Sequence, residues 1–164
     1  MKVNLEHKYS VDVDSLFQLF QDPDFIIERY LETGALSASL LEISDDDGVL
    51  IRVEREVQVD VPSFLSKFMQ PTTRVLQTEH WEGEAGGPYV NDMQVEIHGT
   101  PVKVHVSMQL VAKGKGCVNL VEIETKCGIP LIGSKIADFV ARDAERTANL
   151  EFDFNQAGGR ASVT

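Results

Sequence analysis

Four polar side chains fall where the surrounding pattern is apolar, and they are the first candidates for chemistry. Arg55 interrupts the inward apolar row of the segment 49–59, and Asp143 lies near the apolar side of the last helical pattern. A buried charge is costly unless it is paired, so these two residues could form an ion pair or orient a ligand. Each could instead reach solvent from the side or end of its element. Asn91 and His7 also fall on inward faces, where a histidine usually finds a partner within the core.

Acid–base catalysis has three candidates, Asp143, His7 and Glu79, but no convergent acid–base pair stands out among them. The patterns of nucleophilic catalysis are also missing. The chain has no Gly-x-Ser-x-Gly elbow, and nothing beside Cys127 marks its thiol as activated. The sequence therefore favours a binding protein over an enzyme, while an enzyme that uses the same residues stays open as the alternative.

Metal binding has little support, and we expect no metal and no cofactor. The four histidines, His7, His80, His98 and His105, show no His-x-x-x-His spacing on one element. A two-histidine zinc site between neighbouring strands is the remaining alternative. The acidic run 45–48 lacks the ligand spacing and the downstream glutamate of a calcium loop, so it is interpreted as a solvated hairpin turn.

The length and charge of the chain limit its partners. Its 164 residues fit one domain, and 15 Lys and Arg against 26 Asp and Glu give a net charge of -11. This charge repels phosphate backbones, so nucleic acid is not an expected partner. Residues 1–10 contain no apolar signal-peptide core, and no apolar run approaches the roughly 20 residues that span a bilayer. We expect no membrane span, a cytoplasmic location, and a monomer or weak dimer.

The elements that must position these residues follow from hydrophobic periodicity. Alternation with a period of two predicts strands, and apolar residues three and four apart predict helices. Asp14 and Pro23 begin two short helices, and Pro62 begins a short helical segment that Pro71 ends. The long last helix is predicted to end at Gly158. The predicted strands are 3–9, 36–43, 49–59, 73–82, 89–98, 102–112 and 117–126.

This order predicts an α+β fold. Six consecutive strands joined by turns form an antiparallel sheet with one apolar face, to which the first strand adds a seventh. The long amphipathic C-terminal helix is the only element large enough to cover that face. We therefore predict a seven-stranded curved antiparallel sheet wrapped on the last helix, with two short helices after strand 1. Residues 1–158 form the single domain, and residues 159–164 are predicted to be a frayed tail.

Three segments carry a resemblance to a known family. They are Val61-Pro62-Ser63-Phe64 leading into Phe68, the strand Gln77-Thr78-Glu79-His80-Trp81, and Ile129-Pro130-Leu131-Ile132-Gly133-Ser134-Lys135. With the element order, they resemble the START-like, birch-pollen-allergen-like helix-grip superfamily, which includes polyketide cyclase-like proteins and ligand carriers. The sequence is most similar to an uncharacterised bacterial family within it. The resemblance implies a cavity between sheet and helix that holds an apolar or amphipathic small molecule, such as a lipid or polyketide.

The residues offer candidates for such a cavity. Methionine and aromatic side chains tile adaptable apolar pockets, although a filled core uses the same residue types. The segment 62–70 could cover the mouth of the pocket or plug the end of the core. A polar group of the ligand would be oriented by Arg55, Asp143 or Asn91. A cyclase, aromatase or hydrolase-like enzyme and a closed-core interaction module are the alternatives. The remaining cavity candidates are Phe64, Phe68, Met69, Trp81, Met93, Met108 and Phe139.

Overall fold

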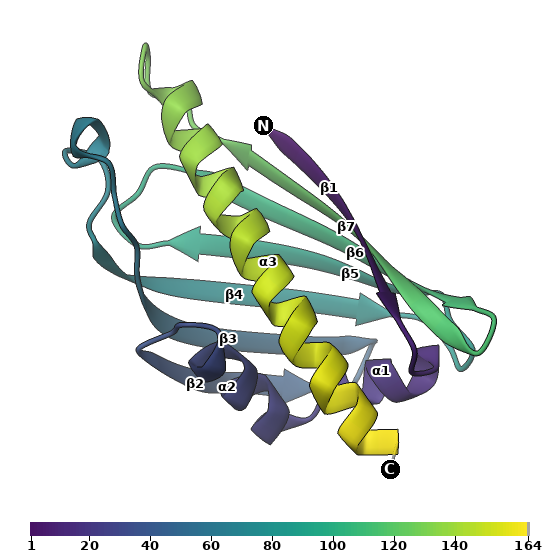
Figure 1. Ribbon diagram of the computed structural model, residues 1–164. Coiled ribbons are helices and arrows are strands. Elements are labelled where there is room, and N and C mark those ends of the chain that lie inside the picture. Colours follow the sequence, from purple (N-terminus) through teal and green to yellow (C-terminus); the bar gives the residue numbers. More distant parts are fainter. Residues whose placement is uncertain (164) are drawn as a thin grey trace.

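A seven-stranded antiparallel sheet curves around one long helix in the computed structural model, as the sequence predicts (Figure 1). The structure describes residues 1–163, with side chains through residue 158. The strand order is β1-β7-β6-β5-β4-β3-β2, so the N-terminal strand pairs with the last one. The elements are β1 (Lys2–Tyr9), α1 (Val13–Phe20), α2 (Pro23–Glu32), β2 (Ser37–Ser44), β3 (Val49–Gln58), the 3-10 turn η1 (Ser63–Leu65), β4 (Thr72–Glu82), β5 (Tyr89–Ile97), β6 (Lys103–Lys113), β7 (Gly116–Lys126) and α3 (Gly133–Val163).

The two short helices begin at aspartate caps, and the cap of α1 differs from the predicted one. The side chains of Asp12 and Asp22 accept hydrogen bonds from the backbone N–H groups of the first turns of α1 and α2. Asp14 lies within the first turn of α1 and does not cap it. Its carboxylate accepts the Tyr89 hydroxyl at 2.6 Å and the Gly86 N–H at 2.8 Å, which ties α1 to the start of β5. The contacts of Asp14 fix α1 across one end of the sheet.

The inner face of the sheet packs in two apolar clusters. One surrounds α1 and α2 and includes Leu16, Ile51 and Trp81, each at most 1% exposed. The other lies under the N-terminal half of α3 and includes Ile123 and Ile136. Figure 1 shows α3 lying diagonally across the concave face, with α1 and α2 beside its C-terminal half. Between these clusters, the sheet and the helix leave room for a cavity.

Two predicted helix boundaries are wrong. The segment that follows Pro62 forms only the 3-10 turn η1, in which Leu65 is buried and Phe64 is 58% exposed. Four apolar residues at helical spacing, Phe64, Leu65, Phe68 and Met69, suggested a helix. A single short turn directs only some of them to the interior. The last helix does not end at Gly158 and continues to Val163, while Thr164 of the predicted tail lies outside the described residues.

Gly158 has a packing role in place of the predicted role as helix terminator. A Cβ atom at this position would lie 2.4 Å from Cε2 of Phe25 in α2. Glycine in a helix costs only about 1 kcal/mol relative to alanine, so it does not by itself end one. Glycine here lets α3 approach α2 closely.

Two features are absent from the described residues, a membrane-spanning helix and a cluster of metal ligands. None of their helices is long and apolar enough to cross a membrane. No group of three or more His, Cys, Asp or Glu side chains in this part of the chain is placed to hold a metal ion.

Candidate functional site

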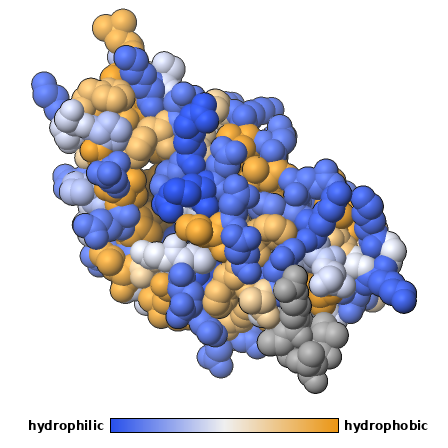
Figure 2. All heavy atoms as spheres, in the orientation of Figure 1, coloured by the Kyte–Doolittle hydropathy of each residue, from blue (hydrophilic) through white to orange (hydrophobic). Residues whose placement is uncertain are grey.

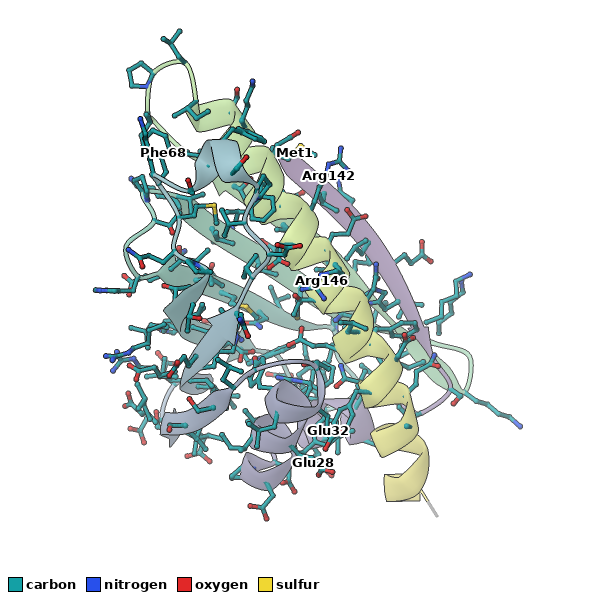
Figure 3. The ribbon with its side chains drawn as sticks, turned by 60° about the vertical axis from the view of Figure 1, so that its left-hand side comes forward. Met1, Glu28, Glu32, Phe68, Arg142 and Arg146 are labelled. Carbon is teal, nitrogen blue, oxygen red and sulfur yellow. The ribbon has the colours of Figure 1, made fainter. Side chains whose placement is uncertain are left out.

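A cavity of about 320 Å³ lies between the inner face of the sheet and α3. Its walls come from the three α-helices and from all strands except β2. Figure 2 shows apolar side chains between polar ones on the face that α3 crosses. Figure 3 shows the two ends of this region, with Phe68 beside the η1 turn and Glu28 and Glu32 on the outer side of α2. The cavity thus lies between the sheet and the C-terminal helix, where the resemblance implies one.

Most of the wall contributed by β5 and β6 is apolar. Aliphatic and thioether side chains of β4 to β7 alternate inward and line the cavity. Six of these side chains are Val75, Met93, Val95, Val104, Val106 and Ile123, and all of them except Val95 are buried. This surface suits an apolar ligand, because burial of apolar area stabilises a complex by about 25 cal/mol per Å².

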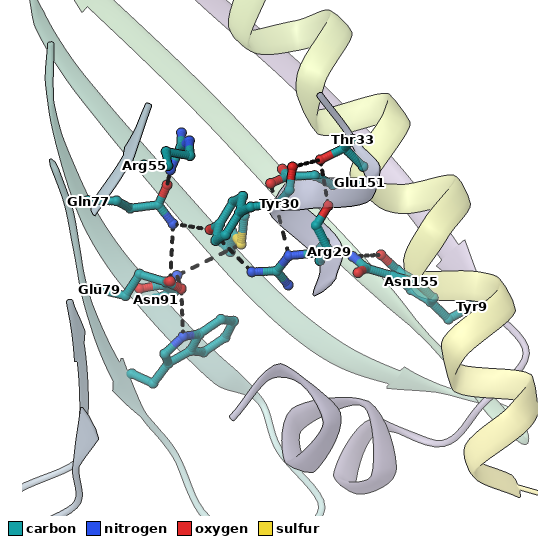
Figure 4. Close-up of polar contacts among 12 residues, drawn as sticks. Tyr9, Arg29, Tyr30, Thr33, Arg55, Gln77, Glu79, Asn91, Glu151 and Asn155 are labelled. Atoms are coloured by element: carbon teal, nitrogen blue, oxygen red, sulfur yellow. Dashed lines mark hydrogen bonds and ion pairs between the residues drawn. The ribbon is translucent and has the colours of Figure 1, made fainter. Parts of the chain in front are cut away.

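A polar network forms the wall between α2, β3 and β4 (Figure 4). The Arg55 Nη1 group donates to Gln77 Oε1 at 2.7 Å. The Gln77 amide in turn donates to the Tyr30 hydroxyl oxygen at 2.6 Å and to Glu79 Oε2 at 3.1 Å. Gln77 and Glu79 are two residues apart on β4, so both side chains point to the inner face. The network places charged groups at one side of an otherwise apolar cavity.

Glu79 is the most heavily bonded member of this network. Its carboxylate accepts from Trp81 Nε1 at 3.1 Å and from Asn91 Nδ2 at 3.0 Å, in addition to Gln77. All four side chains are buried. Three donors therefore satisfy this buried carboxylate, which has no direct cationic partner among the described residues.

Arg29 and Glu151 add an ion pair to the same wall. Arg29 lies in α2, and its Nε atom is 4.0 Å from Glu151 Oε1 of α3. Its Nη2 group donates to the Tyr30 hydroxyl oxygen at 3.2 Å, and its guanidinium carbon lies 5.6 Å from the centre of the Phe20 ring. The Nε atom has no hydrogen-bond partner among the described residues. The pair joins the two helices across the end of the cavity.

The Glu151 carboxyl gives the protein a specific dependence on pH. Burial raises the pKa of Glu151 above its ordinary value of 4.5, and the nearby Arg29 and Arg55 offset only part of this effect. The folded chain therefore holds this proton more tightly than the unfolded chain. Its contribution to the free energy of unfolding is fully present below pH 4.5 and is lost as the pH rises through the raised pKa.

We therefore expect wild type to lose stability relative to Glu151→Gln as the pH rises from 4.5 to neutral, measured by urea unfolding. The exposed Glu6→Gln substitution on β1 is the control, and its curve should run parallel to that of wild type. Parallel curves for wild type and Glu151→Gln would show that this carboxyl does not titrate differently on folding.

The structure brings most of the predicted site residues to the cavity. Asn91 lies behind the wall and bonds to Glu79, and Asp143 bonds to Arg146 at 2.9 Å and not to Arg55. The predicted residues that line the cavity are Arg55, Met69, Trp81, Met93, Met108, Phe139 and Asp143.

Two predicted cavity residues of the segment 62–70 do not line it, which corrects the interpretation of this segment. Phe64 is exposed, and its ring faces the Lys135 ammonium group at 5.6 Å. Phe68 is partly buried against the cluster under α3. Of the apolar residues in this segment, Met69 is the one that reaches the cavity.

Sequence reasoning did not single out Arg29, Gln77 or Glu151. Gln77 could have been found, because Gln77, Glu79 and Trp81 alternate on β4 and must share one face. Arg29 precedes the inward-facing Tyr30 on α2, and nothing in the sequence marks it as buried.

His7 was a candidate acid–base group, and the structure gives it two neighbours on α3. Its Nε2 atom lies 2.9 Å from Asn149 Oδ1, and its ring stacks on Phe152 with centroids 4.3 Å apart. These contacts hold the ring against the helix at the edge of the cavity.

Comparisons with known proteins support this fold. A family described as "Protein of unknown function (DUF2505)" matches residues 4–157. None of the curated proteins matches the sequence.

Three solved structures illustrate the likeness. The protein TTHA0849 from Thermus thermophilus has 15% identity and a TM-score of 0.65 over 96% of this chain and 99% of that one. A START superfamily protein from Mycobacterium smegmatis has 11% identity and a TM-score of 0.63 over 95% and 97% of the two chains. A norcoclaurine synthase point mutant from Thalictrum flavum, in complex with a transition state analogue, has 11% identity and a TM-score of 0.58 over 96% and 95%. Identities this low show a shared fold, and they confirm the predicted START-like helix-grip architecture.

Proposed function

This chain belongs to the DUF2505 family of proteins of unknown function, and we propose that it binds one apolar or amphipathic small molecule in the cavity between the sheet and α3. The ligand is lipid-like or polyketide-like, with most of its surface against the aliphatic walls. Residues 1–158 act as one binding domain. A START superfamily protein and a synthase share this fold, so the fold is compatible with either binding or catalysis.

The observation that carries the proposal is the cavity itself. Ligand pockets have volumes of roughly 300–1,000 Å³, apolar walls and a few polar groups that fix orientation. The cavity of about 320 Å³ lies at the lower end of that range and has both kinds of wall. A closed-core interaction module would bury the same valines and methionines against each other and leave no such space.

Binding is favoured over catalysis because each predicted acid–base residue already has a partner. Glu79 accepts three hydrogen bonds, His7 faces Asn149, and Asp143 is bonded to Arg146. One observation favours an enzyme as the second candidate. Burial raises the pKa of Glu151, and this carboxyl lines the cavity, as a general acid would.

We expect the purified protein to carry its ligand, which native mass spectrometry detects as one adduct per chain that denaturation releases. After the protein is unfolded, extracted and refolded, dimethylaminonaphthalene should bind with one site per chain and a blue-shifted emission, because the cavity is apolar. An excess of the extracted ligand should displace this probe. Absence of both the adduct and saturable probe binding would contradict the proposal.

A further inference from the structure

The Gln77 amide has only one orientation that satisfies its neighbours. A guanidinium can only donate hydrogen bonds, and an ionised carboxylate can only accept them. Gln77 Oε1 therefore faces Arg55, at 2.7 Å, and Gln77 Nε2 faces Glu79, at 3.1 Å. The reverse orientation would set donor against donor and acceptor against acceptor. It follows that Gln77 Nε2 is also the donor to the Tyr30 hydroxyl oxygen, at 2.6 Å.

Tyr30 consequently has a hydroxyl proton with no acceptor among the described residues. Its oxygen accepts from Gln77 and also from Arg29 Nη2, which has no capacity to accept. Burial raises the pKa of Tyr30, so the phenol keeps its proton. Because both protein contacts are donors and Tyr30 lines the cavity, the O–H bond is directed toward the cavity.

Arg55 supplies a second donor beside this hydroxyl. Its guanidinium carbon lies 4.6 Å from the centre of the Tyr30 ring, and one of its N–H groups is used on Gln77. No carboxylate of the described residues pairs with it. Arg55 lines the cavity, so its remaining N–H groups are available there (Figure 4). Tyr30 and Arg55 thus form two neighbouring donors on one wall.

The charges on this wall balance once the Glu151 carboxyl is ionised, above its raised pKa. The two guanidinium groups of Arg29 and Arg55 stand with the two carboxyl groups of Glu79 and Glu151. A ligand group that accepts from these donors therefore needs no charge of its own. A charged group would add a buried charge without a counter-charge. A ketone, ester or other carbonyl oxygen is a neutral acceptor that can take two hydrogen bonds.

We propose that the Tyr30 hydroxyl and the Arg55 guanidinium bind a neutral carbonyl oxygen of the ligand. This inference rests on the proposed function, which it narrows from apolar or amphipathic molecules to those with a carbonyl group. The apolar part of the ligand extends from this point along the valines of β5 and β6. The carbonyl supplies the acceptor that the Tyr30 proton lacks among the described residues.

Tyr89 provides a matched control, because it is a buried tyrosine that does not line the cavity. Its hydroxyl donates to Asp14 Oδ1 at 2.6 Å. Unlike Tyr30, Tyr89 therefore places its proton on a neighbouring side chain.

The test compares three probes that share one ring system. Prodan carries a ketone on dimethylaminonaphthalene, the parent compound has no carbonyl, and dimethylaminonaphthoate carries a carboxylate instead. We expect wild type to bind Prodan more tightly than either of the others. Tyr30→Phe should weaken the binding of Prodan about tenfold and leave that of the parent compound unchanged, while Tyr89→Phe should change the affinity for neither probe. The infrared stretch of carbonyl-labelled Prodan should move to lower wavenumber in wild type and return in Tyr30→Phe.

The outcomes distinguish a failure of this inference from a failure of the proposed function. If the parent compound binds as tightly as Prodan, the carbonyl assignment is overturned, while the cavity still binds ligands. Tighter binding of the carboxylate would overturn the neutral assignment. If Tyr30→Phe weakens both neutral probes equally, its effect is structural and the inference fails. Should Tyr30→Phe not fold by circular dichroism, the infrared shift in wild type still decides. If no probe binds, the proposed function and this inference fail together.

Discussion

The substitution Val106→Trp is expected to abolish ligand binding without unfolding the protein. Val106 lies on the inner face of β6, where it is 7% exposed and lines the cavity. An indole at this position occupies space that the ligand needs within about 320 Å³. Overpacking a filled core costs about 1–3 kcal/mol, but here the added ring enters space that is already empty. We expect the affinity for dimethylaminonaphthalene to fall about a hundredfold or more, with the unfolding temperature near that of wild type.

The matched control for this variant is Gln109→Trp on the same strand. Gln109 is exposed on the outer face of the sheet, so its replacement adds the same ring outside the cavity. Fluorescence titration should show wild-type affinity for this control. If Val106→Trp retained full affinity while folded, the ligand would bind elsewhere. A strong loss of stability in Val106→Trp would indicate that the cavity closes in solution.

The substitution Glu79→Ala is expected to destabilise the protein by about 3 kcal/mol or more, measured by urea unfolding at neutral pH. Removing this carboxylate deprives the buried Trp81 Nε1 and Asn91 Nδ2 groups of their acceptor. Each buried donor left unpaired costs about 1–3 kcal/mol. Gln77 keeps its bond to Tyr30, so the loss falls mainly on the first two donors. The effect is large because every member of this cluster is buried.

Two controls separate the hydrogen-bond effect from loss of a charge. Glu79→Gln keeps one acceptor oxygen, so its loss of stability should be smaller than that of Glu79→Ala. Glu82→Ala removes an exposed carboxylate from the same strand and should change stability by less than about 0.5 kcal/mol. Equal effects for Glu79→Ala and Glu82→Ala would contradict the network described here.

The sheet was predictable because the alternation of apolar and polar residues along a strand shows which face of the sheet each residue occupies. Strict alternation along β3 and β6 assigns Ile51, Val53, Val104 and Val106 to the inner face, and all four are buried there. The long apolar side of α3 then had only one surface to cover. Local pattern was therefore sufficient for the architecture, since a sheet with one apolar face and one long amphipathic helix can pack in few other ways.

The polar wall was not predictable as a network because its members meet only in the folded chain. Tyr30 and Gln77 are 47 residues apart, and Arg55 and Gln77 are 22 apart. Arg55 was recognised from its place in an apolar row, but its partner depends on which strand lies beside β3. Arg29 resembles an ordinary helical arginine until α2 packs against α3.

The segment 62–70 shows a different limit. The apolar content of this segment predicted that Phe64, Phe68 and Met69 all line the cavity. Composition does not determine, however, which side chains of a short turn point inward. The structure turns Leu65 and Met69 inward and leaves Phe64 exposed. Side chains in short irregular segments must therefore be assigned from coordinates.

Methionine methyl NMR tests most directly whether the ligand occupies the cavity. The chain has four methionines, of which Met69, Met93 and Met108 line the cavity, whereas Met1 does not and is 42% exposed. On titration of carbon-13 methyl-labelled protein with dimethylaminonaphthalene, we expect ring-current shifts at these three methyl groups and none at Met1. Saturable binding of the probe without shifts at the three cavity methyl groups would place the site elsewhere and contradict the account.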